Sequence, residues 1–310
     1  MIAPALLLAS LCAAAPAPQR PLPWLWGTAP VPAGWTALGD GAWEPPAAAG
    51  EPRVAAQIDF LEGRSPADWI KVRADPPPAM RKVQRLASVK AGAVEHRGGW
   101  LVVEAEETSV DGSKVKAYYA ALPAPAGVYA ASYTGKEPAF SAHKAEAVAL
   151  IEGFRRLPPP LRFSALPVPG KFSLSAPAGA WRAVVGGADA DLRAIAPLSP
   201  GGGAPGMLLA STLDGGAAEA AAFLARSCPG GASGTRSGEA GLWSLAEASS
   251  RSELVMPEAP AAGGRVYRSR CAALARGGRV YTLLWTAPPA AYDYGVPAFD
   301  EALRSLAPAK

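Results

Sequence analysis

The chain has 310 residues, a formal net charge of +4 and a sequence pI near 9.0. This length fits two domains, and because half of the residues are hydrophobic, each domain can bury its own core. Glycine and proline number 33 each but follow no Gly-x-y period, and the lysines and arginines are scattered apart from one dense patch at 71–85. Composition therefore argues against a collagen-like chain and against nucleic-acid binding, which needs a basic stripe on a recognisable module.

Residues 1–18 resemble a secretory signal peptide, since an apolar run at 5–11 is followed by small residues. That run is too short to cross a bilayer, and no later segment is long and apolar enough to do so. Cys12 raises the alternative of a lipid anchor, although Leu11 stands where a lipidation signal needs a small residue. We expect an exported chain, periplasmic or extracellular.

The first domain is predicted over 22–157 and opens with the sequence PWLWG at 23–27. Trp24 and Trp26 of this sequence either dock the N-terminal segment onto the sheet or remain exposed as a binding patch. Downstream, Ser65 is a suitable N-cap for a helix, with proline at the first helical position. The elements predicted in this domain are a turn and strand at 31–38, a helix at 65–75, strands at 98–106 and 114–122, and a strand, turn and helix at 128–154.

A proline-rich stretch at 158–171 is predicted to be a semi-rigid linker, and a second domain follows over 172–310. The closing stretch at 280–306 aligns without a gap with 128–154, which lies 152 positions earlier, and it keeps both the strand period and the helix period. The matched core positions are Tyr129 with Tyr281, Tyr133 with Trp285, Phe140 with Tyr292, Ile151 with Leu303, and Phe154 with Leu306.

Earlier segments pair in the same way, with small gaps: 31–38 with 176–184, 65–75 with 215–227, 98–106 with 240–248, and 114–122 with 265–274. A period near 150 residues indicates tandem domains rather than solenoid units. Strands outnumber helices and hairpin-length turns join them. The predicted fold class is therefore α+β, with two tandem domains that each pack helices on a mostly antiparallel β-sheet.

This repeated pattern resembles the PsbP-like domains, a family that includes the extrinsic photosystem II subunit, a Ran-binding nuclear transport factor and small bacterial envelope proteins. The residues that carry the resemblance are Pro32, Gly34, Trp35, Tyr129, Tyr133, Thr134, Phe140 and Phe154, and in the second copy Pro177, Gly179, Trp181, Tyr281, Trp285, Thr286, Tyr292 and Leu306. The resemblance implies an α/β/α sandwich in each domain and a non-catalytic binding or assembly role. It supplies no active-site residue to transfer.

Without Cys12, the chain retains Cys228 and Cys271, and an even number of cysteines in an oxidising compartment favours one disulfide. Such a bridge would close a loop of about 44 residues and contribute roughly 3–4 kcal/mol in the chain-entropy model. The alternative is two buried thiols that never meet. Neither cysteine has the C-x-x-C context of redox catalysis or the ligand spacing of a zinc site.

The densest carboxylate cluster contains Glu104, Glu106 and Asp111, which form a weak candidate for a cation site or the exposed face of a half-buried strand. His96 and His143 are the only histidines, and neither has the partners of a Ser-His-Asp device. The glycine-rich loops lack the Lys-Ser/Thr of a phosphate-binding loop. No catalytic residue and no cofactor are predicted.

These observations predict a non-catalytic exported protein of the bacterial envelope that binds a protein or a small ligand, with the groove between the domains as the expected surface. The alternatives are a secreted hydrolase with carboxylates in its loops and a structural spacer protein. Tyr294 faces Ala142 in the other copy and has no aromatic counterpart. It joins Trp24 and Trp26 as a candidate for the binding surface.

Overall fold

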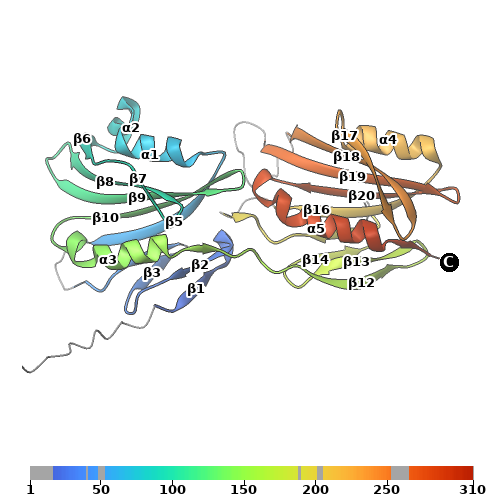
Figure 1. Cartoon of the computed structure of the whole chain (residues 1–310), viewed down its shortest axis with the longest axis horizontal. Helices are drawn as coiled ribbons and strands as arrows, with labels where there is room; N and C mark the ends of the chain where they lie inside the picture. Colours follow the sequence, from blue (N-terminus) through green and yellow to red (C-terminus); the bar gives the residue numbers. More distant parts are fainter. Residues whose placement is uncertain are drawn as a thin grey trace, which may run out of the picture.

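The computed structural model describes residues 17–39, 41–47, 53–187, 190–200, 205–252 and 265–309. Most of the predicted signal peptide (1–18) and Cys12 lie outside these residues. The described chain forms two successive repeats (Figure 1), the first running from β1 to β11 and the second from β12 to β21.

The first repeat contains, in chain order, β1 (Gln19–Leu22), the 3-10 helix η1 (Pro23–Leu25), β2 (Gly27–Pro30), β3 (Thr36–Gly39), β4 (Ala42–Glu44), β5 (Val54–Glu62), α1 (Pro66–Ala74), α2 (Pro78–Val83), β6 (Leu86–Ala91), β7 (Glu95–Arg97), β8 (Trp100–Ser109), β9 (Lys114–Ala124), β10 (Gly127–Gly135), α3 (Ala139–Glu152) and β11 (Arg155–Arg156). The second contains β12 (Arg162–Val168), β13 (Phe172–Ala178), β14 (Arg182–Val185), β15 (Leu192–Ile195), β16 (Met207–Asp214), α4 (Ala217–Ser227), β17 (Ala232–Gly238), β18 (Gly241–Ser252), β19 (Arg265–Arg276), β20 (Arg279–Ala287), α5 (Pro289–Ser305) and β21 (Ala307–Pro308).

Each repeat has one large and one small antiparallel sheet, and the two repeats share one strand order. The large sheets run β3-β4-β5-β10-β9-β8-β6, with β7 beside β8, and β14-β15-β16-β20-β19-β18-β17. The small sheets run β1-β2-β11 and β12-β13-β21. Because β20 begins and ends 152 positions after β10, the predicted register of the duplication is confirmed in the sheet itself.

The helices lie on both faces of each large sheet. In the first repeat α3 packs between the large sheet and β2, while α1 covers the opposite face. In the second repeat α5 lies against β13 and β20, and α4 lies on the other face. Ser65 caps α1 as predicted, because its hydroxyl accepts a hydrogen bond from the backbone N–H of Asp68 at 3.0 Å.

The main core of each repeat lies between the large sheet and the helix that ends it. Aromatic residues at alternate positions of β10 and β20 point to this side, so the predicted matched pairs are buried in both copies. The copies differ at the core position where Trp285 replaces Tyr133. The larger indole of Trp285 is accommodated by two neighbouring glycines. A Cβ atom on Gly206 would lie 2.1 Å from the Trp285 ring, and one on Gly295 would lie 2.0 Å from it.

The predicted α+β class is wrong: the structure is mostly β, with about 51% of the described residues in strands and 23% in helices. The missed strands include β5, which has no proline, and several that contain prolines: β1, β2, and β12, which fills half of the stretch predicted to be a linker at 158–171. Proline prevents a strand from donating one ladder hydrogen bond but is tolerated at sheet edges. β1 and β2 pair with each other and β12 pairs with the adjacent β13, but each small sheet is completed by a strand from far along the chain, β11 or β21, which local propensity does not reveal.

Candidate binding site at the seam between the repeats

The loop between β1 and β2 is longer than its counterpart between β12 and β13, and it reaches the second repeat. In the first repeat this connection contains η1 and Trp26, whose backbone is left-handed with φ 49° and ψ 52°. The Trp26 side chain is only 1% exposed, and it packs in the core of the second repeat rather than in its own. The sequence left docking and exposure open, and Trp26 docks onto the other repeat. The side chain of Trp24 is outside the described part of the structure.

Three contacts hold Trp26 in place. Its indole Nε1 donates to the backbone oxygen of Leu198 at 2.8 Å. Its ring lies 4.6 Å from the ring of Tyr294, with 54° between the planes. Its backbone oxygen accepts a hydrogen bond from the N–H of Leu157, which is where the chain leaves the first repeat. The crossing from one repeat to the next is therefore fastened at the same residue that enters the second core.

Tyr294 continues this contact into the second repeat. Its ring is stacked on Trp181 with 6.0 Å between the centroids, and the Trp181 indole donates to the Tyr294 hydroxyl at 3.1 Å. Trp181 in turn lies 5.6 Å from Trp285. Burial raises the pKa of Tyr294, so its hydroxyl is neutral and its proton remains available to donate. An aromatic column thus runs from the seam into the core of the second repeat.

A cavity of about 670 Å³ opens beside this column, and we call it the proline groove. Its prolines come from the β9–β10 turn, the segment between β11 and β12, and α5: Pro125, Pro158, Pro159, Pro160 and Pro297. Its other lining residues are Arg156, Leu161, Asp293 and Tyr294. Prolines have no N–H to donate and little freedom to move, so this wall is rigid and its prolines supply no backbone hydrogen-bond donor.

A second hollow of about 650 Å³ lies elsewhere on the seam. It is lined by the end of β5 and the residues before α1 in the first repeat, and by Val266, Pro288 and Pro289 in the second. It contains none of the aromatic column. The proline groove is therefore the hollow in which Tyr294, one of the residues predicted for a binding surface, is placed beside the contact that fixes the two repeats together.

The proline groove is lined by charged residues of both signs. Arg156 and Asp293 both line it, and Asp293 lies 3.5 Å from the guanidinium of Arg268. Arg268 also lies 4.0 Å over the ring of Tyr292 and 3.1 Å from Glu247. The groove therefore has both a cation and an anion at its apolar walls.

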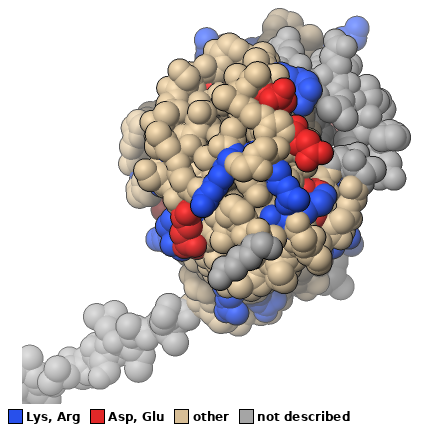
Figure 2. Space-filling model, turned by 90° about the vertical axis from the view of Figure 1, so that its right-hand side faces the viewer, with Lys and Arg blue, Asp and Glu red and all other residues tan. Residues whose placement is uncertain are grey.

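The far end of the second repeat also has mixed charge. In Figure 2, which looks at this end, basic and acidic residues lie intermingled over the described surface. Lys171 forms an ion pair with Asp191, and Arg304 forms pairs with Glu301 at 2.6 Å and Glu239 at 3.7 Å. Each of these bases is thus partly neutralised, and this face forms no basic stripe among the described residues.

The candidate cation ligands do not converge on one point. Glu104 pairs with Lys144 at 2.7 Å, Glu106 pairs with Lys114 at 3.0 Å, and Asp111 accepts from the backbone N–H of Ser113 at 2.9 Å. The Lys114 hydrogen bond lowers the pKa of Glu106, and the Ser113 hydrogen bond lowers that of Asp111. Within the described residues there is no group of three or more histidine, cysteine or carboxylate side chains that could hold a metal ion.

The two histidines have ordinary surroundings. His143 lies on α3 with its Nδ1 3.3 Å from a Glu146 oxygen and its ring edge-on to Trp35. Glu146 also accepts a hydrogen bond from the Trp35 indole at 3.0 Å. His96 lies in the exposed strand β7. The environment of His143 is a structural contact around Trp35.

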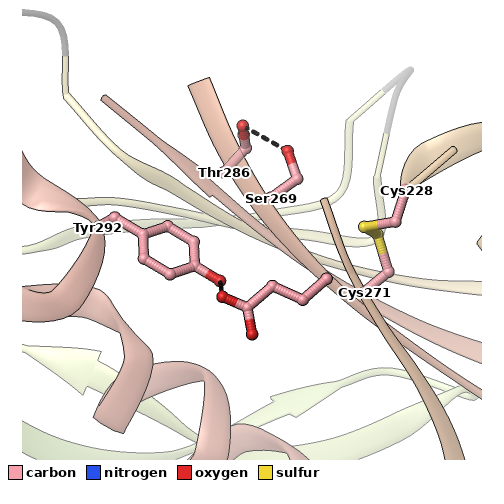
Figure 3. The surroundings of a disulfide bond; sticks show 6 residues. Cys228, Ser269, Cys271, Thr286 and Tyr292 are labelled. Carbon is pink, nitrogen blue, oxygen red and sulfur yellow. Dashed lines mark hydrogen bonds between the residues drawn. A yellow bond between two sulfur atoms is a disulfide. The ribbon is translucent and has the colours of Figure 1, made fainter. Parts of the chain in front are cut away.

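A disulfide joins Cys228 at the end of α4 to Cys271 in β19 (Figure 3), which confirms the predicted pairing.

In the first repeat a different contact holds α1 against the sheet. Tyr119 stands where the second repeat has Cys271, and the rings of Trp69 and Tyr119 meet edge to face at 5.8 Å. Arg73 lies 5.3 Å over both rings. A covalent bond in one repeat thus replaces an aromatic and cationic contact in the other.

No family model and no curated protein matches this sequence. A solved structure from Bacteroides thetaiotaomicron VPI-5482 is similar at 16% identity, with a TM-score of 0.31. The match covers 48% of this chain and 48% of that chain, so this chain spans about half the length of its structural neighbour. A likeness of this degree supports no inference about fold or function, and the resemblance to PsbP-like domains stays a prediction.

None of the described helices is long and apolar enough to span a membrane. The disulfide is compatible with export. The aromatic column could not be recognised from the sequence, because Trp26 and Tyr294, which meet at the seam, lie near opposite ends of the chain. The available signal was that PWLWG and Tyr294 both depart from the repeat, and the structure brings Trp26 and Tyr294 into contact.

Proposed function

We propose that this chain is a non-catalytic, exported binding protein of the bacterial envelope and that it holds its ligand, a protein or a small molecule, in the proline groove. The observation that carries the proposal is the convergence of Trp26 and Tyr294 at the seam. In a duplicated fold most core positions recur in both copies, so side chains without a counterpart that meet at the seam indicate specialisation there.

The composition of the groove supports this proposal. Its volume of about 670 Å³ is in the range of ligand sites, which are mostly apolar and have a few well-placed polar groups. The proline wall is rigid before any ligand arrives, which reduces the entropy that binding would otherwise cost. Tyr294 can donate one hydrogen bond, while Arg156 and Asp293 supply one charge of each sign.

The disulfide supports the exported location in this proposal, because disulfides persist in oxidising compartments. N-terminal sequencing of the protein recovered from the envelope fraction tests this part. We expect a mature chain that begins after Ala14, and an intact N-terminus on cytoplasmic protein would contradict export. The alternatives of a secreted hydrolase and a structural spacer stay predictions.

Capture from the envelope fraction tests the groove itself. Pro160 is exposed and lines the groove, so Pro160→Arg should obstruct it without entering a core. Pro169 is an equally exposed proline in the β12–β13 turn, and Pro169→Arg is the matched control. We expect the wild-type protein and Pro169→Arg to retain the same species and Pro160→Arg to lose it. Equal retention by all three proteins would place the ligand elsewhere.

A further inference from the structure

The edge strands of this molecule differ in how they are protected from pairing with another chain. An exposed strand edge presents unpaired N–H and C=O groups, and proteins usually block it with prolines, bulges, charges or short length. Among the described edge strands, β1 contains Pro21, β12 contains Pro167, and β3 and β6 have shifted registers. The edge strands β11, β14 and β21 have at most four residues each.

The edge strand β17 (Ala232–Gly238) has none of these protections. It is the last strand of its sheet, it pairs with β18 over all seven residues without a bulge, and its side chains are almost all exposed. Its sequence, ASGTRSG, contains no proline and a single charge. That charge, Arg236, forms an ion pair with Asp300 of α5 at 2.5 Å, so it is directed to a face of the sheet rather than guarding its edge.

The register of β17 shows which backbone groups are free. Gly238 and Gly241 face each other across a two-residue turn, so they form the hydrogen-bonded pair that closes the hairpin. Because bonded and non-bonded positions alternate in an antiparallel ladder, Ser233, Thr235 and Ser237 direct their N–H and C=O groups away from β18. Three residues therefore offer a donor and an acceptor each along one straight edge.

We propose that β17 is a self-association surface and that it binds β17 of a second copy of this chain, antiparallel and centred on Thr235. In this arrangement Thr235 faces Thr235 of the second copy, and Ser233 faces Ser237, which gives about six backbone hydrogen bonds between the chains. Arg236 faces Gly234, so no like charges oppose each other. A parallel arrangement would place the two arginines side by side, which disfavours it.

The side chains that face each other in the antiparallel arrangement are thus small polar groups without opposed like charges, and Thr–Thr and Ser–Ser pairs of this kind stabilise a strand pair. A single strand pair buries little surface, so the dimer is weak and concentration-dependent. The proposal does not depend on the proline groove, since β17 contributes no residue to that site. It adds a second, independent surface to the molecule.

Sedimentation velocity of the full mature chain over a wide concentration range tests the proposal. We expect wild-type protein to shift from monomer to dimer as concentration rises. Thr235→Lys and Thr235→Glu each place like charges opposite one another, so each variant should dimerise at least tenfold more weakly. An equimolar mixture of the two variants should restore a dimer.

Ser88→Lys, in the edge strand β6 of the first repeat, is the matched control and should dimerise as the wild type does. Thermal melting of each variant checks its fold, which should be unchanged because Thr235 is exposed. Wild-type protein that is monomeric at every concentration, or a dimer that Thr235→Lys leaves intact, would overturn the proposal. A mixture of the two charged variants that stays monomeric would overturn the antiparallel register.

Discussion

Replacing Trp26 with alanine should destabilise the second repeat, although the residue belongs to the first. The side chain is 1% exposed, and removing a buried tryptophan costs about 3–5 kcal/mol through lost burial and the cavity left behind. The change also removes the hydrogen bond to Leu198, whose carbonyl then lacks its indole donor. We therefore expect a loss near 4 kcal/mol, and for a domain of about 150 residues this lowers Tm by roughly 8–16 °C.

Differential scanning calorimetry of the full mature chain measures this effect, and hydrogen exchange assigns it. In Trp26→Ala, amides of α5 and β20 should lose protection, while those of β5 and β10 should keep it, since the core of the first repeat does not contain Trp26. Trp43 is the matched control, because it is 3% exposed and packs in the core of the first repeat. Trp43→Ala should show the opposite pattern of lost protection.

Two outcomes would contradict this assignment: Trp26→Ala reduces protection equally in β5, β10, β20 and α5, or reduces it only in the first repeat. Either outcome would mean that Trp26 contributes to its own domain rather than to its neighbour. An unchanged melting profile would show that the seam contact adds nothing to stability.

Three further predictions concern the two repeats separately. The double variant Cys228→Ser, Cys271→Ser should lower the free energy of unfolding by about 4 kcal/mol, because the bridge closes a loop with a separation of 43 residues. Amide hydrogen exchange should rise in α4 but not in α1, and equal changes in both helices would contradict this. Gly295→Ala should lower the free energy of unfolding by about 1–3 kcal/mol, because its Cβ would lie 2.0 Å from the Trp285 ring. Gly234→Ala has open space around it and should change the stability of the protein by less than about 0.5 kcal/mol, and thermal melting compares the two variants. Burial raises the pKa of Tyr129 from 10.0 to about 12, so the contribution of this tyrosine to the stability of the fold is fully present below pH 10 and is lost as the pH rises towards 12. Absorbance titration of tyrosinate in wild-type protein and in Tyr129→Phe measures this pKa, and a midpoint of 10 for Tyr129 would contradict burial.

The duplication could be predicted from sequence because its evidence is local. The strand period around Tyr129 and Tyr281 and the helical spacing that ends at Phe154 and Leu306 survive in one register, and these residues are buried in both copies. The disulfide followed from counting cysteines after removal of the predicted signal peptide. Both inferences needed only short stretches of chain.

The fold class and the seam depend on contacts between distant segments. β11 pairs with β2 through Arg155 and Thr28, and no local pattern indicates that partnership. Prolines at 158–160 suggested a linker, yet the chain becomes a strand at Arg162. The contact between Trp26 and Tyr294 joins the two ends of the chain, so each residue could be recognised as unusual but not as the partner of the other.

Site-specific photo-cross-linking in the living cell tests the central claim, that the proline groove is the functional surface, most directly. A photo-reactive residue at Leu161, inside the groove, is compared with one at Val83 on α2, which is 84% exposed and distant in the fold. We expect a discrete adduct from position 161 that position 83 does not give and that Pro160→Arg abolishes. The same adducts from both positions, or none from position 161, would contradict it.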